Sequence, residues 1–203
     1  MNSDSLSDWL GYINSKRPNE KEFGLERLKG VYSELIKKPI AAKTILIAGT
    51  NGKGSTAEFL KNFLFSAGFT VGVYTSPHLI HFNERIRING KQACDEKIIS
   101  SFKKIEDCKG KTKLTYFDYA TLAAFDIFSE AKLDFAILEI GIGGKYDPVN
   151  LLDSDISIIT NKIFQPFLSK TFDGFAPLQK PESSINLKGL NLSGKRVIES
   201  KDN

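Results

Sequence analysis

Residues 46–56 have the sequence Leu-Ile-Ala-Gly-Thr-Asn-Gly-Lys-Gly-Ser-Thr. An apolar run ends at Ala48, a glycine-rich turn follows, and residues 55–67 then show helical periodicity. This order predicts a strand, a loop and a helix. Glycines allow a backbone loop to approach an anion closely, and the amides at a helix start attract negative charge. Lys53 adds a full positive charge, so the stretch predicts a phosphate site.

The loop departs from the common P-loop pattern G-x-x-x-x-G-K-[ST] because Gly54 stands between Lys53 and Ser55. Ser55 and Thr56 are equally suited to cap the helix or to bind Mg²⁺. A glycine-rich turn without a ligand is the alternative for the whole segment. We predict that a nucleotide is bound by Gly49, Thr50, Asn51, Gly52, Lys53, Gly54, Ser55 and Thr56.

The rest of residues 6–161 alternates between helical and extended patterns. Helices are predicted at two places within 6–37, at 95–108 with Asp95 as N-cap, and at 117–131. Strands are predicted at 69–74, 135–140 and 156–160, and Asn89-Gly90 predicts a tight turn after a short strand within 82–91. Such alternation is typical of an α/β fold with a mostly parallel sheet flanked by helices.

Polar residues follow three of these strands, at the sheet edge where α/β proteins bind ligands. Glu139 is an acid within an apolar strand, which is costly unless a cation or a donor compensates it. We expect Mg²⁺ bound to phosphates as that cation, and a satisfied core carboxylate is the alternative. The Ser76 hydroxyl, which also follows a strand, is placed to reach the same metal.

Other polar residues have two interpretations each. His78 and His81 have no metal-ligand spacing, so loop or surface histidines are the default. Residues 83–85 form either an ion-paired loop or a site in which Arg85 holds an acidic or carbonyl group of a substrate. Residues 117–119 either pack in the core with an acidic first helical turn or line a substrate pocket, and both interpretations fit the sequence.

Composition narrows the class of protein. The 203 residues are 41% hydrophobic and 26% charged, which suits one sizeable α/β domain, alone or with an appendage. The net charge of +4 does not argue for nucleic acid, and no apolar run is long enough to span a membrane. The polar N-terminus predicts no secretory signal, and Cys94 and Cys108 lack metal spacing, so we expect a cytoplasmic protein with free thiols.

Five motifs in order resemble the folylpolyglutamate synthase/dihydrofolate synthase family of the Mur ligase superfamily. The resemblance covers about residues 6–161. The motifs are Gly-Thr-Asn-Gly-Lys-Gly-Ser at 49–55, Tyr-Thr-Ser-Pro-His at 74–78, Phe-Asn-Glu-Arg-Ile at 82–86, Leu-Thr-Tyr-Phe at 114–117 and Leu-Glu-Ile-Gly-Ile-Gly-Gly at 138–144.

The resemblance implies a Mur ligase-like central domain and an ATP-dependent amide ligase that acts as a monomer. ATP would phosphorylate a carboxylate of dihydropteroate or a reduced folate, and the amino group of L-glutamate would then attack the acyl phosphate. The resemblance assigns residues 49–55 to the ATP phosphates, Ser76 and Glu139 to Mg²⁺, and Lys53 and Glu139 to catalysis. Substrate contacts are expected from Thr75, Pro77, His78, Phe82, Arg85 and Phe117.

The chain also departs from the family pattern. The family's Gly-Gly-Arg-Leu-Asp-Ala-Thr-Asn is Gly-Gly-Lys-Tyr-Asp-Pro-Val-Asn at 143–150, and the resemblance ends at Asn161. The family's later histidine and modified lysine have no counterparts, so we expect an ATP-binding domain at 1–161, a divergent tail at 162–203 that is a candidate for disorder, and no C-terminal domain. A truncated ligase is thus the first hypothesis. A non-catalytic nucleotide-binding remnant is the second, and a small P-loop kinase or GTPase, which explains the loop alone, is the third.

Overall fold

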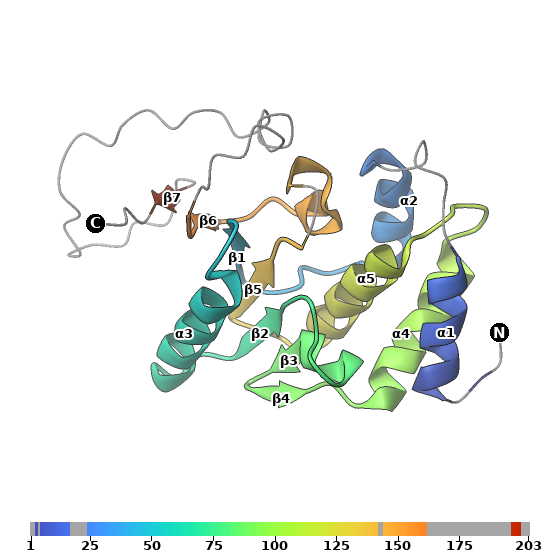
Figure 1. Cartoon of the computed structure of the whole chain (residues 1–203), viewed down its shortest axis with the longest axis horizontal. Helices are drawn as coiled ribbons and strands as arrows, with labels where there is room; N and C mark the ends of the chain where they lie inside the picture. Colours follow the sequence, from blue (N-terminus) through green and yellow to red (C-terminus); the bar gives the residue numbers. More distant parts are fainter. Residues whose placement is uncertain (1–2, 4, 17–23, 142–143, 162–195, 200–203) are drawn as a thin grey trace.

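A mixed β-sheet forms the centre of the molecule (Figure 1). The computed structural model describes residues 3, 5–16, 24–141, 144–161 and 196–199. In that part of the chain seven strands follow the order β4-β3-β2-β5-β1-β6-β7. The strands are β1 (Lys43–Ala48), β2 (Val71–Tyr74), β3 (Ile86–Ile88), β4 (Lys91–Gln92), β5 (Phe135–Glu139), β6 (Ile156–Ile159) and β7 (Arg196–Glu199). All neighbouring pairs are parallel except those of β3, which pairs antiparallel with β2 and β4.

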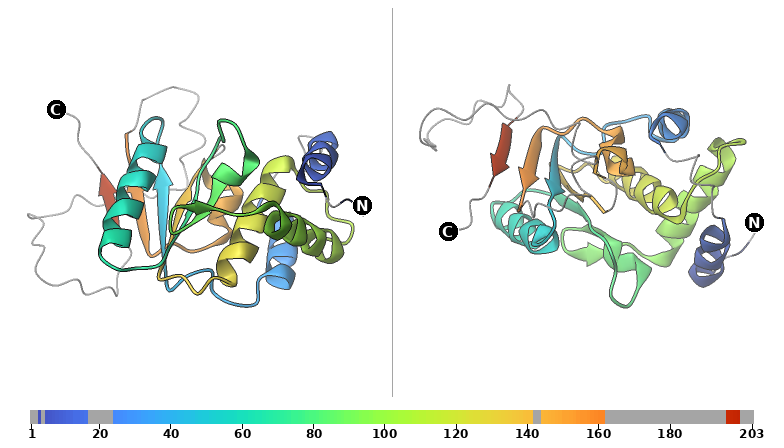
Figure 2. Two further views of the ribbon diagram at one scale, coloured as in Figure 1. Left: turned by 90° about the horizontal axis from the view of Figure 1, so that it is seen from below. Right: turned by 45° about the horizontal axis from the view of Figure 1, so that its top comes forward.

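Helices cover both faces of this sheet, as Figure 2 shows. On one face lies α3 (Lys53–Ser66), and on the other lies α5 (Tyr116–Ser129), which contacts three further helices. These are α1 (Leu6–Ser15), α2 (Glu26–Leu35) and α4 (Asp95–Cys108). Three short 3₁₀ turns complete the described part: η2 (Phe82–Arg85), η3 (Gly144–Tyr146) and η4 (Pro148–Leu151). The predicted α/β class, with a mostly parallel sheet between helices, is confirmed.

Strand β1 is buried on both faces because its side chains alternate between two apolar clusters. Ile45 and Ile47 pack on the α3 side, and Leu46 and Ala48 pack on the α5 side. The neighbouring β5 is likewise buried from Ala136 onward. This explains the near-continuous apolar runs, which are typical of central parallel strands.

The N-caps of two helices differ from the predictions. α3 begins at Lys53, two residues earlier than predicted, because Gly52 has φ 78° and caps the helix without a side-chain hydrogen bond. Hence the proposed cap roles of Ser55 and Thr56 are wrong. The prediction of Asp95 as an N-cap is also wrong: Cys94 has the extended cap conformation, and Asp95 Oδ1 instead accepts a hydrogen bond from the side-chain amide of Asn83 in η2.

Of residues 162–203, the structure describes only β7, which pairs with β6 at the sheet edge. The prediction that the tail is a candidate for disorder concerns residues 162–195 and 200–203, which lie outside the described residues. Within the described part of the chain, no helix combines the length and the apolar character needed to cross a membrane.

Candidate functional site

The loop between β1 and α3, residues 49–55 with the first turn of the helix, is called the phosphate loop below. Gly49 and Gly52 have φ values of 138° and 78°, which side chains other than glycine rarely adopt. A Cβ at Gly49 would lie 2.2 Å from Thr160 Oγ1, whereas a Cβ at Gly54 would meet nothing within 4 Å. The two positions therefore differ in what they require. Packing against Thr160 requires a glycine at position 49, whereas the space around Gly54 at the helix start is open.

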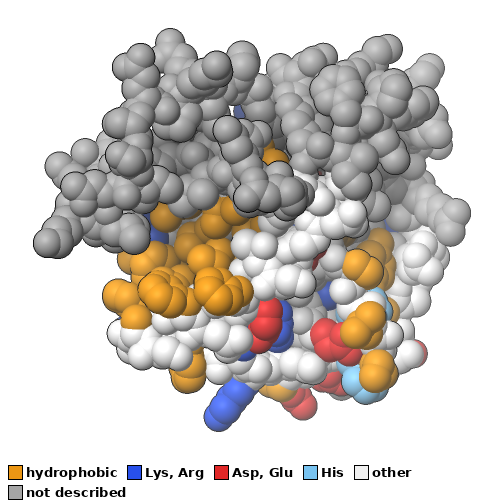
Figure 3. Space-filling view, turned by 60° about the vertical axis from the view of Figure 1, so that its left-hand side comes forward, with side chains coloured by type: hydrophobic (Ala, Val, Ile, Leu, Met, Phe, Trp, Pro, Cys, Tyr) orange, Lys and Arg blue, Asp and Glu red, His pale blue; other side chains and the backbone are white. Residues whose placement is uncertain are grey.

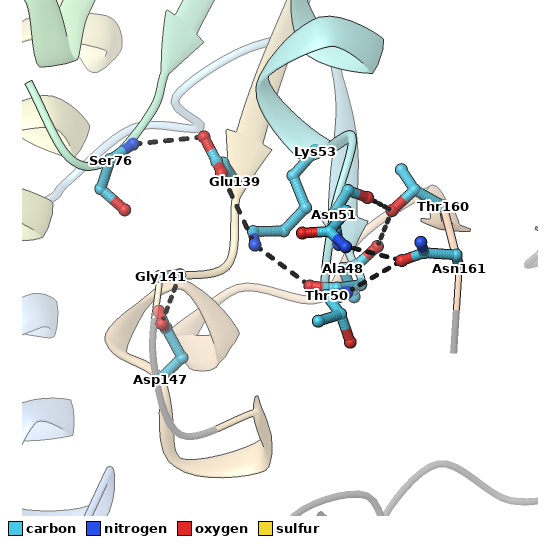
Figure 4. A network of polar contacts seen from close by, with 11 residues as sticks. Ala48, Thr50, Asn51, Lys53, Ser76, Glu139, Gly141, Asp147, Thr160 and Asn161 are labelled. Atoms are coloured by element: carbon cyan, nitrogen blue, oxygen red, sulfur yellow. Dashed lines mark hydrogen bonds and ion pairs between the residues drawn. The ribbon is translucent and has the colours of Figure 1, made fainter. Parts of the chain in front are cut away.

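Lys53 lies across this loop and points toward β5 (Figure 4). Its ammonium group donates a hydrogen bond to the Gly49 carbonyl oxygen at 3.1 Å, and its Nζ is 3.9 Å from Glu139 Oε1. The side chain is 17% exposed. A mostly buried cation beside the amides of a helix start can attract an anion with little competition from water.

Glu139 ends β5 and is almost completely buried. Its Oε2 accepts a hydrogen bond from the Ser76 backbone N–H at 3.2 Å. Burial raises the pKa of Glu139 above its ordinary value, and the Ser76 N–H with the charges of Lys53 and Arg85 offsets part of that rise. The negative charge of the carboxylate is therefore only partly compensated, and a further positive partner would stabilise it.

The described residues fit a magnesium ion only if phosphate and water complete its shell. They contain no group of three His, Cys, Asp or Glu side chains that could hold a metal by themselves. Ser76 and Glu139 do lie next to each other, at the ends of the adjacent strands β2 and β5. Mg²⁺ in nucleotide sites is held in this way, by one or two protein groups plus phosphate oxygens.

Replacing Glu139 with glutamine tests this assignment. A raised folded-state pKa makes the folded protein lose stability as the pH rises from the ordinary glutamate pKa through the raised value. Without nucleotide, the free energy of unfolding of Glu139→Gln, measured with urea across this pH range, should no longer show this decrease. With nucleotide, the gain in ATP affinity on adding Mg²⁺ should fall roughly ten- to hundredfold. The exposed Glu26→Gln on α2 is the control, and an unchanged Mg²⁺ response in Glu139→Gln would refute the metal assignment.

Residues 75–85, called the Ser-Pro loop below, are held in one shape by their own contacts. The Thr75 N–H donates to the Arg85 carbonyl oxygen at 3.0 Å, which closes the loop at its base. The Glu84 carboxylate accepts three backbone N–H groups, from Leu79, Ile80 and His81, at 2.7, 2.9 and 2.7 Å. These N–H groups lower the pKa of Glu84 to about 2. The carboxylate thus organises the loop, which was not predicted.

Arg85 is buried within this loop, and its Nε donates a hydrogen bond to His78 Nδ1 at 2.8 Å. Burial and the Arg85 charge lower the pKa of His78, which favours the neutral imidazole that accepts this hydrogen bond. The Arg85 guanidinium also lies 5.7 Å from the ring centroids of both Phe82 and Tyr116. An ion-paired loop at 83–85 was one interpretation of this segment; Glu84 instead accepts backbone N–H groups, and Arg85 donates to His78.

Phe82, which the resemblance places among the substrate contacts, lies mostly within the fold. Its side chain is 3% exposed and packs edge-on against Phe102 and Tyr116, with ring centroids 5.8 and 6.0 Å apart. The ring belongs to the apolar core between the Ser-Pro loop and α4. An isolated motif cannot reveal this, because the burial comes from residues far along the chain.

Phe117 lies at the start of α5, and its ring tip faces the turn after β5. A Cβ at Gly141 would lie 2.5 Å from that ring and 3.0 Å from Ser76 Oγ, so the Ser-Pro loop, α5 and this turn meet at one point. The buried Asp147 supports the turn, since its carboxylate accepts the N–H groups of Gly141 and Val149 at 2.8 and 2.9 Å. The supporting role of Asp147 was not predicted, although its persistence in the motif was a signal.

Thr160 and Asn161 also belong to the site but were not predicted. They follow β6, the neighbour of β1, and contact the phosphate loop (Figure 4). Their position after a parallel strand beside the loop was the signal that could have identified them.

The fold and the site together have the arrangement of a nucleotide-binding α/β domain. A glycine-rich loop links a central parallel strand to a helix, its lysine reaches an acid on the adjacent strand, and the neighbouring strand end supplies Ser76. These are the parts of a phosphate site with a divalent cation.

Sequence comparisons identify the family. No family model matches the chain. The chain is 41% identical over 157 residues to the dihydrofolate synthase/folylpolyglutamate synthase of Escherichia coli, and 38% identical over 145 residues to that of Bacillus subtilis. These matches cover 77% and 68% of the chain but 37% and 34% of the relatives. The matched part of the chain is therefore homologous to this family, as predicted, and it spans well under half the length of the relatives.

Solved structures agree in fold. An Escherichia coli FolC structure in complex with DHPP and ADP has a TM-score of 0.77 at 38% identity, covering 81% of this chain and 40% of that one. A bifunctional folylpolyglutamate synthase/dihydrofolate synthase with Mn, AMPPNP and L-glutamate bound has a TM-score of 0.71 at 44% identity, covering 76% and 37%. Both likenesses cover at least three quarters of this chain.

Proposed function

We propose that this chain binds ATP with Mg²⁺ and forms the nucleotide-binding part of a ligase that joins L-glutamate to dihydropteroate or a reduced folate. One observation carries the proposal: Lys53 bridges the phosphate loop and Glu139, beside Ser76, in a chain 41% identical to such a synthase. We assign residues 1–161 to this ATP-binding domain and treat the sequence of residues 162–203 as divergent from the family; of these, the structure describes only β7, which joins the same sheet.

The described residues suit the first half of such a reaction. The amides at the start of α3 and Lys53 would hold the phosphates and neutralise charge as a substrate carboxylate oxygen bonds to the γ-phosphorus and ADP leaves. A magnesium ion between Ser76, Glu139 and the phosphates would disperse the same charge. The glutamate nitrogen would then bond to the acyl carbon, losing a proton as phosphate leaves. We assign the folate side of the site to Thr75, Pro77, His78, Arg85 and Phe117.

Calorimetric titration of the chain with ATP, in the presence and absence of Mg²⁺, tests the binding step. We expect saturable ATP binding that strengthens with Mg²⁺, whereas no binding in either condition would refute the proposal. ADP release with dihydropteroate and L-glutamate then tests turnover. A preference for GTP, or phosphate transfer to a nucleoside, would instead favour a P-loop GTPase or kinase.

A second candidate is nucleotide binding without turnover. It is favoured by the residues that depart from the family motif, which are Lys145, Tyr146, Pro148 and Val149. ATP binding without substrate-dependent ADP release would support this candidate over the ligase.

We further propose a monomer that works in the cytoplasm. Cys94 and Cys108 are both free, which suits a reducing compartment. Light scattering of the purified chain tests the monomer, and a stable dimer would contradict it.

A further inference from the structure

The phosphate loop is tied to the end of β6 by Asn161. The Asn161 side-chain oxygen accepts hydrogen bonds from the backbone N–H groups of Thr50 and Asn51, at 3.2 and 2.9 Å (Figure 4). The Asn161 backbone oxygen lies 3.4 Å from the same Thr50 nitrogen. Two amides at the front of the loop are therefore already bonded within the protein.

Thr160 donates hydrogen bonds to two backbone carbonyl oxygens, one within the phosphate loop and one just before it. Its hydroxyl donates to the Asn51 carbonyl oxygen at 2.5 Å, and its backbone N–H donates to the Ala48 carbonyl oxygen at 2.9 Å. The second bond continues the pairing of β1 with β6 beyond the end of the strand. Gly49 permits this approach, since a Cβ there would collide with the Thr160 hydroxyl. We call these contacts of Thr160 and Asn161 the β6 clasp.

The β6 clasp divides the loop into two parts. The amides of Thr50 and Asn51 are held by the protein, whereas the amides of the first turn of α3 have no partner within their helix. Lys53 lies on the second part. An anion would thus meet the helix start and Lys53, with the front of the loop fixed beforehand. Fixing a loop in its binding shape improves affinity by reducing the entropy lost on binding.

We propose that Asn161 is a positioning residue that fixes the phosphate loop for a nucleoside triphosphate. This inference rests on the proposed nucleotide binding. The opposite possibility is that the Asn161 oxygen occupies a place that a phosphate oxygen would take, so that it competes with the nucleotide. The two possibilities predict opposite effects of removing the side chain.

Two substitutions of Asn161 separate a positioning role from a purely structural one. In Asn161→Ala, the Thr50 and Asn51 amides should exchange with solvent on the order of tenfold faster, and ATP affinity should fall. Asn161→Asp keeps an oxygen for the two amides but adds a negative charge beside the bound phosphates. Its ATP affinity should fall about tenfold at low salt, with smaller losses for ADP and AMP, and salt should reduce the effect.

Asn89 supplies a matched control. Its side-chain oxygen also accepts a strand N–H, from Val71 at 2.8 Å, but at the opposite end of the sheet. Asn89→Asp therefore repeats the chemical change at a similar bond away from the loop. It should leave the affinities for ATP, ADP and AMP unchanged.

Calorimetry and site-resolved amide exchange on the full chain decide between the outcomes. Weaker ATP binding in both Asn161 variants, with faster exchange only in Asn161→Ala, supports the proposal. Tighter binding in Asn161→Ala overturns it in favour of competition, and unchanged affinity in both variants also overturns it. If the unmodified chain binds no nucleotide, the proposed function fails. The exchange rates of Thr50 and Asn51 then still decide whether the β6 clasp fixes the loop.

Discussion

Replacing Gly49 with alanine should destabilise the fold by roughly 3 kcal/mol and abolish nucleotide binding. Gly49 has φ 138°, and an added Cβ would lie 2.2 Å from Thr160 Oγ1 and 3.2 Å from the Asn161 backbone nitrogen and oxygen. The new methyl group must therefore strain the backbone or push β6 away from β1. Either change disrupts the start of the phosphate loop.

Urea unfolding followed by circular dichroism measures the effect, and Gly54→Ala is the matched control. A Cβ at Gly54 meets nothing within 4 Å, and the residue lies in the first turn of α3. Its replacement should leave stability unchanged or raise it by about 0.5–1 kcal/mol. Lower ATP affinity of a stable Gly54→Ala would show that the open space serves the ligand. A Gly49→Ala protein as stable as the unmodified chain would contradict the packing argument.

Replacing Lys53 with alanine should weaken ATP binding roughly ten- to hundredfold, the range for a charged hydrogen bond. Lys53 is the cation that links the phosphate loop to Glu139, with Nζ 3.1 Å from the Gly49 oxygen and 3.9 Å from Glu139 Oε1. Its loss removes a positive charge from the loop and leaves the buried Glu139 with less compensation. A negative charge would then face the incoming phosphates.

Lys61→Ala is the control for this change, because Lys61 lies on the same helix and pairs with Glu58 away from the loop. Calorimetry with ATP and Mg²⁺ at low and moderate salt is the measurement. Lys61→Ala should bind as the unmodified chain does. Equal affinities of Lys53→Ala and the unmodified chain would remove the lysine from the site.

Patterns within short segments predicted the fold well. The apolar run of β5 and the glycines before α3 place a strand end and a helix start where the structure has them, within two residues. Parallel topology then brings the ends of β1, β2 and β5 together, so the proximity of Lys53, Ser76 and Glu139 was predictable.

Short-range patterns were less informative where a distant part of the chain determines a residue's surroundings. Phe82 belongs to a substrate motif by its neighbours in sequence, yet it packs against Phe102 in the core. Glu84 has an adjacent arginine, yet it binds three backbone amides of its own loop. In both cases burial and hydrogen bonding outweigh the pattern that the sequence displays.

The sequence by itself determined the class of fold, the phosphate loop and the family, because these depend on periodicity, glycine positions and motif order within short segments. Only the tertiary structure decided how the loop is held. Asn161 is 110 residues from Asn51, and the two meet because β6 pairs with β1. Hydrogen bonds of this kind depend on strand order and register, which place side chains from distant segments within 3 Å or so of a backbone amide.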